Sequence, residues 1–322
     1  MRQIVLFSAK AAISAALLYL AIGRTNFSII GERLNQLDPA WFAAAVAVAL
    51  LQILLGALRW RQVALRCDAS LAVPSAFRFA LIASFFNQVL PSTVGGDAVR
   101  VWLFAREGAG WSKATYSVLL DRFIGVLLLA VLVVICLPWS LRLVTNPIGQ
   151  AALLLIGFGS IGGAVLFVAL SFAPWAFLQR WWLTRHLMQL AVTARELFLS
   201  ASTVAIVVAL SLVIHVLSAA IAWCAARAVG APFDFLHALL LIPPIMLIAT
   251  IPISIAGWGV REKSLVLAFA YAGLPETDGF LVSVLLGVSM FAVGLVGGLV
   301  WLVSGTPLRL SAALRGEKPP AS

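Results

Sequence analysis

Two similar ten-residue segments interrupt the long apolar stretches of this chain, one in each half. The first reads Pro91-Ser-Thr-Val-Gly-Gly-Asp-Ala-Val-Arg100, and the second, 161 residues later, reads Pro252-Ile-Ser-Ile-Ala-Gly-Trp-Gly-Val-Arg261. Broken, glycine-containing apolar segments at matching positions of two halves are typical of transporters built from internal repeats. Short Pro/Gly/Ser motifs also recur by chance in Val- and Ala-rich sequences. The apolar segments that flank the two copies keep the same offset, which favours duplication.

The composition indicates a membrane protein. Hydrophobic residues make up 63% of the 322 residues, charged residues make up 11%, and the mean hydropathy is +1.08. About a quarter of the residues in a soluble domain are charged, so we expect an all-α polytopic membrane protein. Lys and Arg in cytoplasmic loops then explain the net charge of +10, and no nucleic-acid partner is expected. Cys67, Cys136 and Cys224 lack disulfide or metal-binding spacing.

Six apolar segments are long enough to cross a hydrocarbon core about 30 Å thick. They are residues 4–22, 41–58, 118–139, 151–172, 203–224 and 280–303. Two further apolar segments, 76–90 and 236–251, each end at a proline and precede a second, weakly apolar piece. We predict both as re-entrant hairpins, because the backbone groups freed by such a break are tolerated only under protein or a water-filled cavity.

Basic residues are distributed unevenly between alternate loops. With six crossings and an inner N-terminus, the inner loops hold Arg59 and ten further basic residues, and the outer loops hold four. The asymmetry predicts cytoplasmic termini in a bacterial inner (plasma) membrane. Three crossings separate the hairpins, so the two halves have inverted topology. We predict one transmembrane domain over residues 1–303, with halves of about 1–140 and 149–303, and a short basic cytoplasmic tail over 304–322.

The two arginines that follow the breaks are the strongest candidates for ligand binding. Arg100 and Arg261 lie where a half-helix begins, and the unpaired N–H groups of a helix N-terminus attract anions as a guanidinium does. Nearby glycines allow the backbone to approach a ligand closely. Two such sites that face each other near the midplane suit a phosphate. The alternative is that Arg100 pairs with Asp97, and Arg261 with Glu262, as structural ion pairs.

Other polar residues leave two interpretations open. Asp121 and Arg122 open the third span, where they either contact a ligand or extend to the membrane surface. Asn87 either holds the broken backbone or contacts the ligand. His215 is predicted to be a neutral histidine hydrogen-bonded between helices rather than a proton relay. Trp60 and other tryptophans near span ends are predicted to form an interfacial belt.

The sequence predicts a set of substrate-binding residues. It predicts no catalytic residue, no metal ligand and no cofactor. The set consists of Asn87, Thr93, Gly95, Gly96, Asp97, Arg100, Asp121, Arg122, Ser254, Gly257, Gly259, Arg261 and Glu262.

The chain resembles the flippase-like transmembrane domain of the lysylphosphatidylglycerol synthase family. The resemblance rests on Asn87-Gln-Val-Leu-Pro-Ser-Thr-Val-Gly-Gly-Asp-Ala-Val-Arg100, on Leu119-Leu-Asp-Arg122 and on Pro252-Ile-Ser-Ile-Ala-Gly-Trp-Gly-Val-Arg-Glu262. In two-domain members of this family, the membrane part moves an aminoacylated phospholipid between leaflets and a soluble domain makes that lipid. No soluble domain is visible in this sequence, so the resemblance implies lipid movement without lipid synthesis. Stand-alone relatives are labelled as translocators of other lipids, such as hopanoids or polyprenyl-linked lipids.

We therefore expect a protein, not an enzyme, that flips an anionic lipid or lipid-linked precursor between leaflets. Arg100 and Arg261 are expected to hold the head group, and a phospholipid or polyprenyl-linked lipid is the expected partner. One alternative is a membrane-embedded lipid-modifying transferase or its accessory subunit, since a few relatives are associated with lipid glycosylation. Another is a transporter of soluble anions. The sequence leaves a homo-oligomer open.

Overall fold

The computed structural model describes residue 19 and residues 27–90, 95–172, 200–250 and 258–304. Within these ranges the protein is all-helical and contains no strand. The helices are α2 (Phe27–Asn35), α3 (Pro39–Arg66), α4 (Val73–Val89), α5 (Gly95–Phe104), the π-helical turn η1 (Ala105–Ala109), α6 (Trp111–Leu143), α7 (Pro147–Phe172), α9 (Ala201–Ala228), α10 (Phe235–Ala249), α11 (Val260–Tyr271) and α12 (Glu276–Val303). The predicted first span (apart from Tyr19), the two break prolines and the basic tail lie outside the described residues.

Four of these helices are long and apolar enough to cross a membrane. They are α3, α6, α9 and α12, of 28, 33, 28 and 28 residues, and each contains one of the six predicted spans. Helix α7 coincides with another predicted span, and its stretch Pro147–Gly163 is apolar but shorter, as is α10. The chain is therefore a multi-pass, all-α membrane protein.

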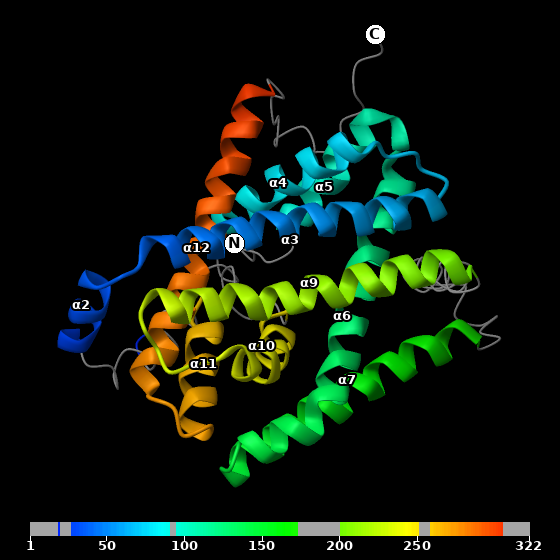
Figure 1. The fold of residues 1–322 in the computed structure, drawn as a ribbon. Coiled ribbons are helices and arrows are strands. Elements are labelled where there is room, and N and C mark those ends of the chain that lie inside the picture. Colours follow the sequence, from blue (N-terminus) through cyan, green and yellow to red (C-terminus); the bar gives the residue numbers. More distant parts are fainter. Residues whose placement is uncertain (1–18, 20–26, 91–94, 173–199, 251–257, 305–322) are drawn as a thin grey trace, which may run out of the picture.

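Helices α3 and α9 form an antiparallel pair at the centre of the molecule (Figure 1). The N–H group of Asp38, which precedes α3, donates to the carbonyl of Ala228 at the end of α9, 2.8 Å away. Midway along the pair, the Gln52 amide donates to the Ile214 carbonyl at 3.0 Å and to the Ser218 hydroxyl at 2.5 Å. These bonds satisfy a polar side chain that would otherwise face an apolar surrounding.

The remaining helices flank this pair on both sides. Helices α4 and α5 lie on one side of it, and α10 and α11 lie on the other (Figure 1). Helix α12 packs across one end of the pair and α6 across the other. The helix pairs α4–α5 and α10–α11 therefore lie on opposite sides of a common centre (Figure 1).

Glycines of α12 allow it to contact α4 directly. A Cβ atom at Gly297 would overlap the carbonyl oxygen of Leu81 in α4, and a Cβ at Gly298 would lie 2.9 Å from the ring of Phe85. Small residues at helix contacts allow backbones in membranes to approach closely. The α4–α12 contact thus fixes the position of the helix that leads into the first break.

Two prolines inside α10 leave a backbone carbonyl without its usual N–H donor, and a side chain of α6 donates to it instead. Pro243 and Pro244 lie in the interior of α10, and Pro244 has no N–H to donate to the carbonyl of Leu240. The hydroxyl of Ser140 in α6 donates to that carbonyl at 3.2 Å. This bond ties α10, which leads to the second break, to the long helix α6.

Candidate functional site

Five charged side chains form a cluster where α3, α5 and α6 meet. Asp121, which is 2% exposed, accepts hydrogen bonds from Arg59 Nε at 2.9 Å and from Arg100 Nη2 at 3.1 Å. Asp97 accepts from Arg122 Nε at 2.6 Å and from Arg100 Nη1 at 3.4 Å. We call these five residues the arginine cluster. With three guanidinium groups and two carboxylates, the cluster has a formal charge of +1.

The first break places α5 so that its charges point into the cluster. The Gly96 N–H donates to the Asn87 side-chain oxygen at 2.9 Å, so Asn87 holds the start of α5 against the end of α4. A Cβ at Gly96 would overlap the Ala83 carbonyl and the Asn87 amide, so only glycine fits here. Asp97 and Arg100 are three residues apart and therefore share one face of α5.

Two residues of α3 complete the cluster from the opposite side. The Arg100 guanidinium lies over the Trp60 ring, 4.1 Å from its centroid, and the fully buried Trp60 donates from Nε1 to the Ser117 hydroxyl at 3.2 Å. Arg59 also donates to the Ser211 hydroxyl of α9 at 3.1 Å. A cation placed over an aromatic face is stabilised further when water is excluded.

The cluster has one more positive charge than negative charges, and one of its guanidinium groups is partly exposed. The side chain of Arg122 is 49% exposed, although its Nε is paired with Asp97. Arg100 Nε is buried and has no hydrogen-bond partner among the described residues. Buried donors are nearly always paired in native proteins. The excess positive charge and the half-exposed guanidinium are complementary to an anionic group, whereas the buried Arg100 Nε is not accessible to one.

A second, neutral cluster lies at the start of α11. Arg261 donates from Nη2 to Glu262 at 2.6 Å and from Nε to the Ser283 hydroxyl of α12 at 3.2 Å. Glu262 also accepts the N–H of Gly259 at 2.6 Å, and Gly259 has a φ of 88°, which disfavours a side chain. A Cβ at Gly287 would overlap the Arg261 guanidinium. The two formal charges cancel, so this cluster has no excess charge.

The structure divides the predicted site residues between these two clusters. Asn87, Gly96, Asp97, Arg100, Asp121 and Arg122 lie in or beside the arginine cluster, and Gly259, Arg261 and Glu262 form the second cluster. Gly95 contacts Leu90. Thr93, Ser254 and Gly257 lie outside the described residues.

The ion pairs named as the structural alternative are both present. Asp97 pairs with Arg100 and Glu262 with Arg261. The hydrogen-bond partners described for Arg100 are Asp97 and Asp121, and those described for Arg261 are Glu262 and Ser283. The described residues thus form one charged cluster around each arginine, and a shared site for the two arginines stays a prediction.

Three interpretations of single residues are corrected. Asp121 does not extend to a membrane surface, because it is buried between two arginines. Trp60 is not part of an interfacial belt, and Arg59 is not a loop residue, since α3 continues through both and buries them. A basic residue directly after an apolar run ordinarily lies at the interface. The sequence positions of Arg59 and Trp60 therefore gave no indication that these residues are buried. His215 is hydrogen-bonded between helices as predicted, since its Nε2 donates to the Gly125 carbonyl of α6 at 3.1 Å.

One of two comparisons with known proteins relates the chain to a family. The sequence model of the family described as the lysylphosphatidylglycerol synthase TM region matches residues 7–298. A search of curated proteins found no match. The matched range includes both charged clusters and the helices that surround them, apart from the last five residues of α12.

Proposed function

Since the chain belongs to the family of lysylphosphatidylglycerol synthase TM regions, we propose that it flips an anionic lipid or lipid-linked precursor between membrane leaflets. Membership of the family supports a lipid-related role in a membrane. The arginine cluster supports the anionic head group, because it combines a net positive charge with a half-exposed arginine. The lipid is moved without chemical change, so the protein is not an enzyme.

Arg122 is the residue that meets the head group in this proposal. Its Nε is held by Asp97, and its side chain is 49% exposed. Guanidinium groups bind phosphate through paired, charge-assisted hydrogen bonds. A bound phosphate compensates the excess charge of the cluster, and the cluster replaces part of the water that a head group loses inside the membrane.

The proposed architecture has six spans and two re-entrant hairpins in inverted halves. Several observations support it. Helices α9 and α10 begin 162 residues after α3 and α4, and α12 begins 165 residues after α6. The equivalent helices α3 and α9 run antiparallel, and the two breaks lie on opposite sides of them (Figure 1). An axis in the membrane plane relates such halves in transporters with inverted repeats.

Cysteine labelling from outside the cell tests this topology. We expect a membrane-impermeant maleimide to react with Glu276→Cys, because the loop before α12 is placed outside, and to miss Leu183→Cys, because that region is placed in the cytoplasm. Burial and, to a lesser degree, the Asp68 carboxylate raise the pKa of the native Cys67 thiol to about 11, so its background labelling is slow. The reverse labelling pattern would reject the six-span arrangement.

The proposed function is tested with Arg122→Gln. A hydrogen bond to a charged group contributes about 1.5–3 kcal/mol, so loss of the phosphate contact should slow lipid movement roughly ten- to a hundredfold. The measurement is a leaflet-resolved lipid assay in proteoliposomes that contain phosphatidylglycerol, phosphatidic acid or a polyprenyl phosphate. Because Arg122 is half exposed, we expect the variant to insert and fold normally.

Arg78→Gln is the matched control. Arg78 is 47% exposed and pairs with Glu107 at 2.9 Å, so it resembles Arg122 in exposure and in its carboxylate partner but lies outside the arginine cluster. This variant should move lipids at the wild-type rate. If Arg122→Gln also does so with every anionic lipid, the arginine cluster is not the head-group site and the proposal is rejected.

A further inference from the structure

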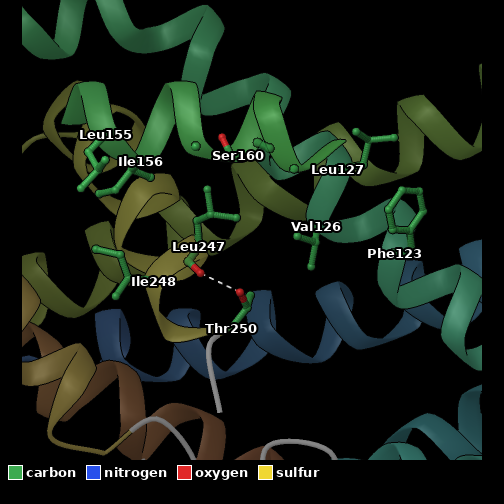
Figure 2. A pocket seen from close by; sticks show the side chains of 12 residues that line it. Phe123, Val126, Leu127, Leu155, Ile156, Ser160, Leu247, Ile248 and Thr250 are labelled. Carbon is green, nitrogen blue, oxygen red and sulfur yellow. Dashed lines mark hydrogen bonds between the residues drawn. The ribbon is translucent and has the colours of Figure 1, made fainter. Parts of the chain in front are cut away.

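An apolar cavity lies between α6, α7 and α10 (Figure 2). Its volume is about 380 Å³, and its walls include Phe123 and Val126 of α6, Leu155 of α7 and Leu247 of α10. Val126 and Leu155 are 38% and 76% exposed, so the cavity opens to the side of the molecule. The volume falls within the range of about 300–1,000 Å³ that is usual for binding sites of small molecules.

The polar atoms at the cavity do not favour a polar ligand. Two hydroxyl residues, Ser160 and Thr250, contribute to its lining. Ser160 donates to the Gly157 carbonyl at 2.8 Å and Thr250 donates to the Leu247 carbonyl at 2.6 Å, so both hydroxyl protons are used within their own helices (Figure 2 draws the second bond). A polar ligand would lose its hydration without finding donors here, whereas a hydrocarbon would not.

The half-exposed arginine of the cluster lies next to this cavity. Arg122 directly precedes Phe123 and lies four residues before Val126, both of which line the cavity. Residues four apart share one face of a helix, so Arg122 and Val126 follow each other along the exposed side of α6. A cationic group thus adjoins an apolar cavity, an arrangement complementary to a molecule with an anionic head and a hydrocarbon chain.

We propose that this cavity holds one hydrocarbon chain of the translocated lipid while Arg122 binds its head group. The inference rests on the proposed function. It adds where the hydrocarbon chain of the lipid lies, which is between α6, α7 and α10. A soluble anion would leave the cavity unfilled, and an uncharged lipid would leave the excess charge of the cluster uncompensated. The lateral opening means that the lipid reaches this place from the bilayer.

Photo-crosslinking in vesicles tests the proposal on the wild-type protein. The probes are phosphatidic acid and phosphatidylcholine that carry a diazirine in one acyl chain, each added to vesicles of unlabelled phosphatidylcholine. We expect phosphatidic acid to label peptides around Leu155 and Leu247 about tenfold more than phosphatidylcholine does. Of the two head groups, only that of phosphatidic acid has a net negative charge to pair with Arg122. Arg122→Gln should remove this preference.

A bulky side chain in the cavity provides the second test. Gly159 lines the cavity, and a Cβ there meets no atom within 4 Å, so the backbone position accepts a side chain, and the Trp of Gly159→Trp should occupy the space of the cavity. Labelling by phosphatidic acid and lipid movement should both fall about tenfold, as several methylene groups lose their apolar contacts. Gly162→Trp is the control, since Gly162 also has open space around it but does not line the cavity.

The outcomes separate this inference from the proposed function. Equal labelling by both probes, unaffected by Arg122→Gln, means that the cavity holds ordinary bilayer lipid and overturns the inference. So does normal lipid movement in Gly159→Trp. The proposed function would survive both results if Arg122→Gln still slowed lipid movement as expected. Because the comparison of the two probes needs no variant, it decides the matter even if Gly159→Trp does not fold.

Discussion

Replacing Asp121 by asparagine is expected to prevent accumulation of the folded protein. The substitution keeps the shape of the side chain but removes the charge that Arg59 and Arg100 share. The cluster would then contain three guanidinium groups and one carboxylate. Removal of one partner from a buried ion pair costs about 3–5 kcal/mol, which is a large part of a typical stability of about 5–15 kcal/mol.

The measurement is the yield of monodisperse protein in mild detergent, together with its Tm. Asp234→Asn is the control, because Asp234 is 65% exposed and caps α10, a role that asparagine fills equally well. A double variant, Asp121→Asn with Arg59→Met, removes one positive charge as well and should recover part of the lost stability. Wild-type yield and Tm for Asp121→Asn alone would show that the charge of Asp121 is not needed for folding.

Gly297→Ala is expected to destabilise the protein although it adds a single methyl group. That methyl would overlap the Leu81 carbonyl oxygen, and a backbone atom cannot rotate away as the end of a side chain does. Overpacking in a core ordinarily costs about 1–3 kcal/mol, and we expect a cost at or above the upper end. Helix α4 would be pushed from α12, and with it Asn87, which holds the start of α5.

Gly162→Ala is the matched control for this variant. Gly162 also lies within a long apolar helix, but a Cβ there meets nothing within 4 Å. Without a clash, alanine stabilises a helix by roughly 0.5–1 kcal/mol relative to glycine. The two variants should therefore change the Tm in opposite directions. A Tm that does not fall in Gly297→Ala would show that α4 and α12 can separate at little cost.

The sequence was sufficient to predict the features that depend on local pattern. Four of the six spans predicted from hydrophobic runs are long apolar helices. The pairs Asp97–Arg100 and Arg261–Glu262, named from the sequence as an alternative to ligand binding, are present. Such features depend on residues near each other in the chain, whose geometry within a helix is fixed.

The composition of the arginine cluster was not predictable in the same way. Arg59 and Trp60 lie at the end of an apolar run, and a residue in that position is buried or exposed according to which helix packs beside it. Here α6 approaches and supplies Asp121 as a common partner for Arg59 and Arg100. The repeat did not reveal this either, because the position that corresponds to Asp121 in the second half is Val282. The predicted repeat identified equivalent positions in the two halves. It did not identify which residues those positions contact.

If the chain flips a lipid as proposed above and uses no energy source, the unequal charge of the two clusters has a kinetic consequence. At equal chemical potential of the lipid in both leaflets, detailed balance requires equal flux in the two directions, however asymmetric the protein is. Tighter binding at one cluster shifts populations only by the difference in affinity. Tighter binding at one cluster determines from which leaflet a lower lipid content saturates the carrier. It also determines at which step the bound lipid stays longest. Net direction must then come from reactions that supply the lipid on one side of the membrane or consume it on the other.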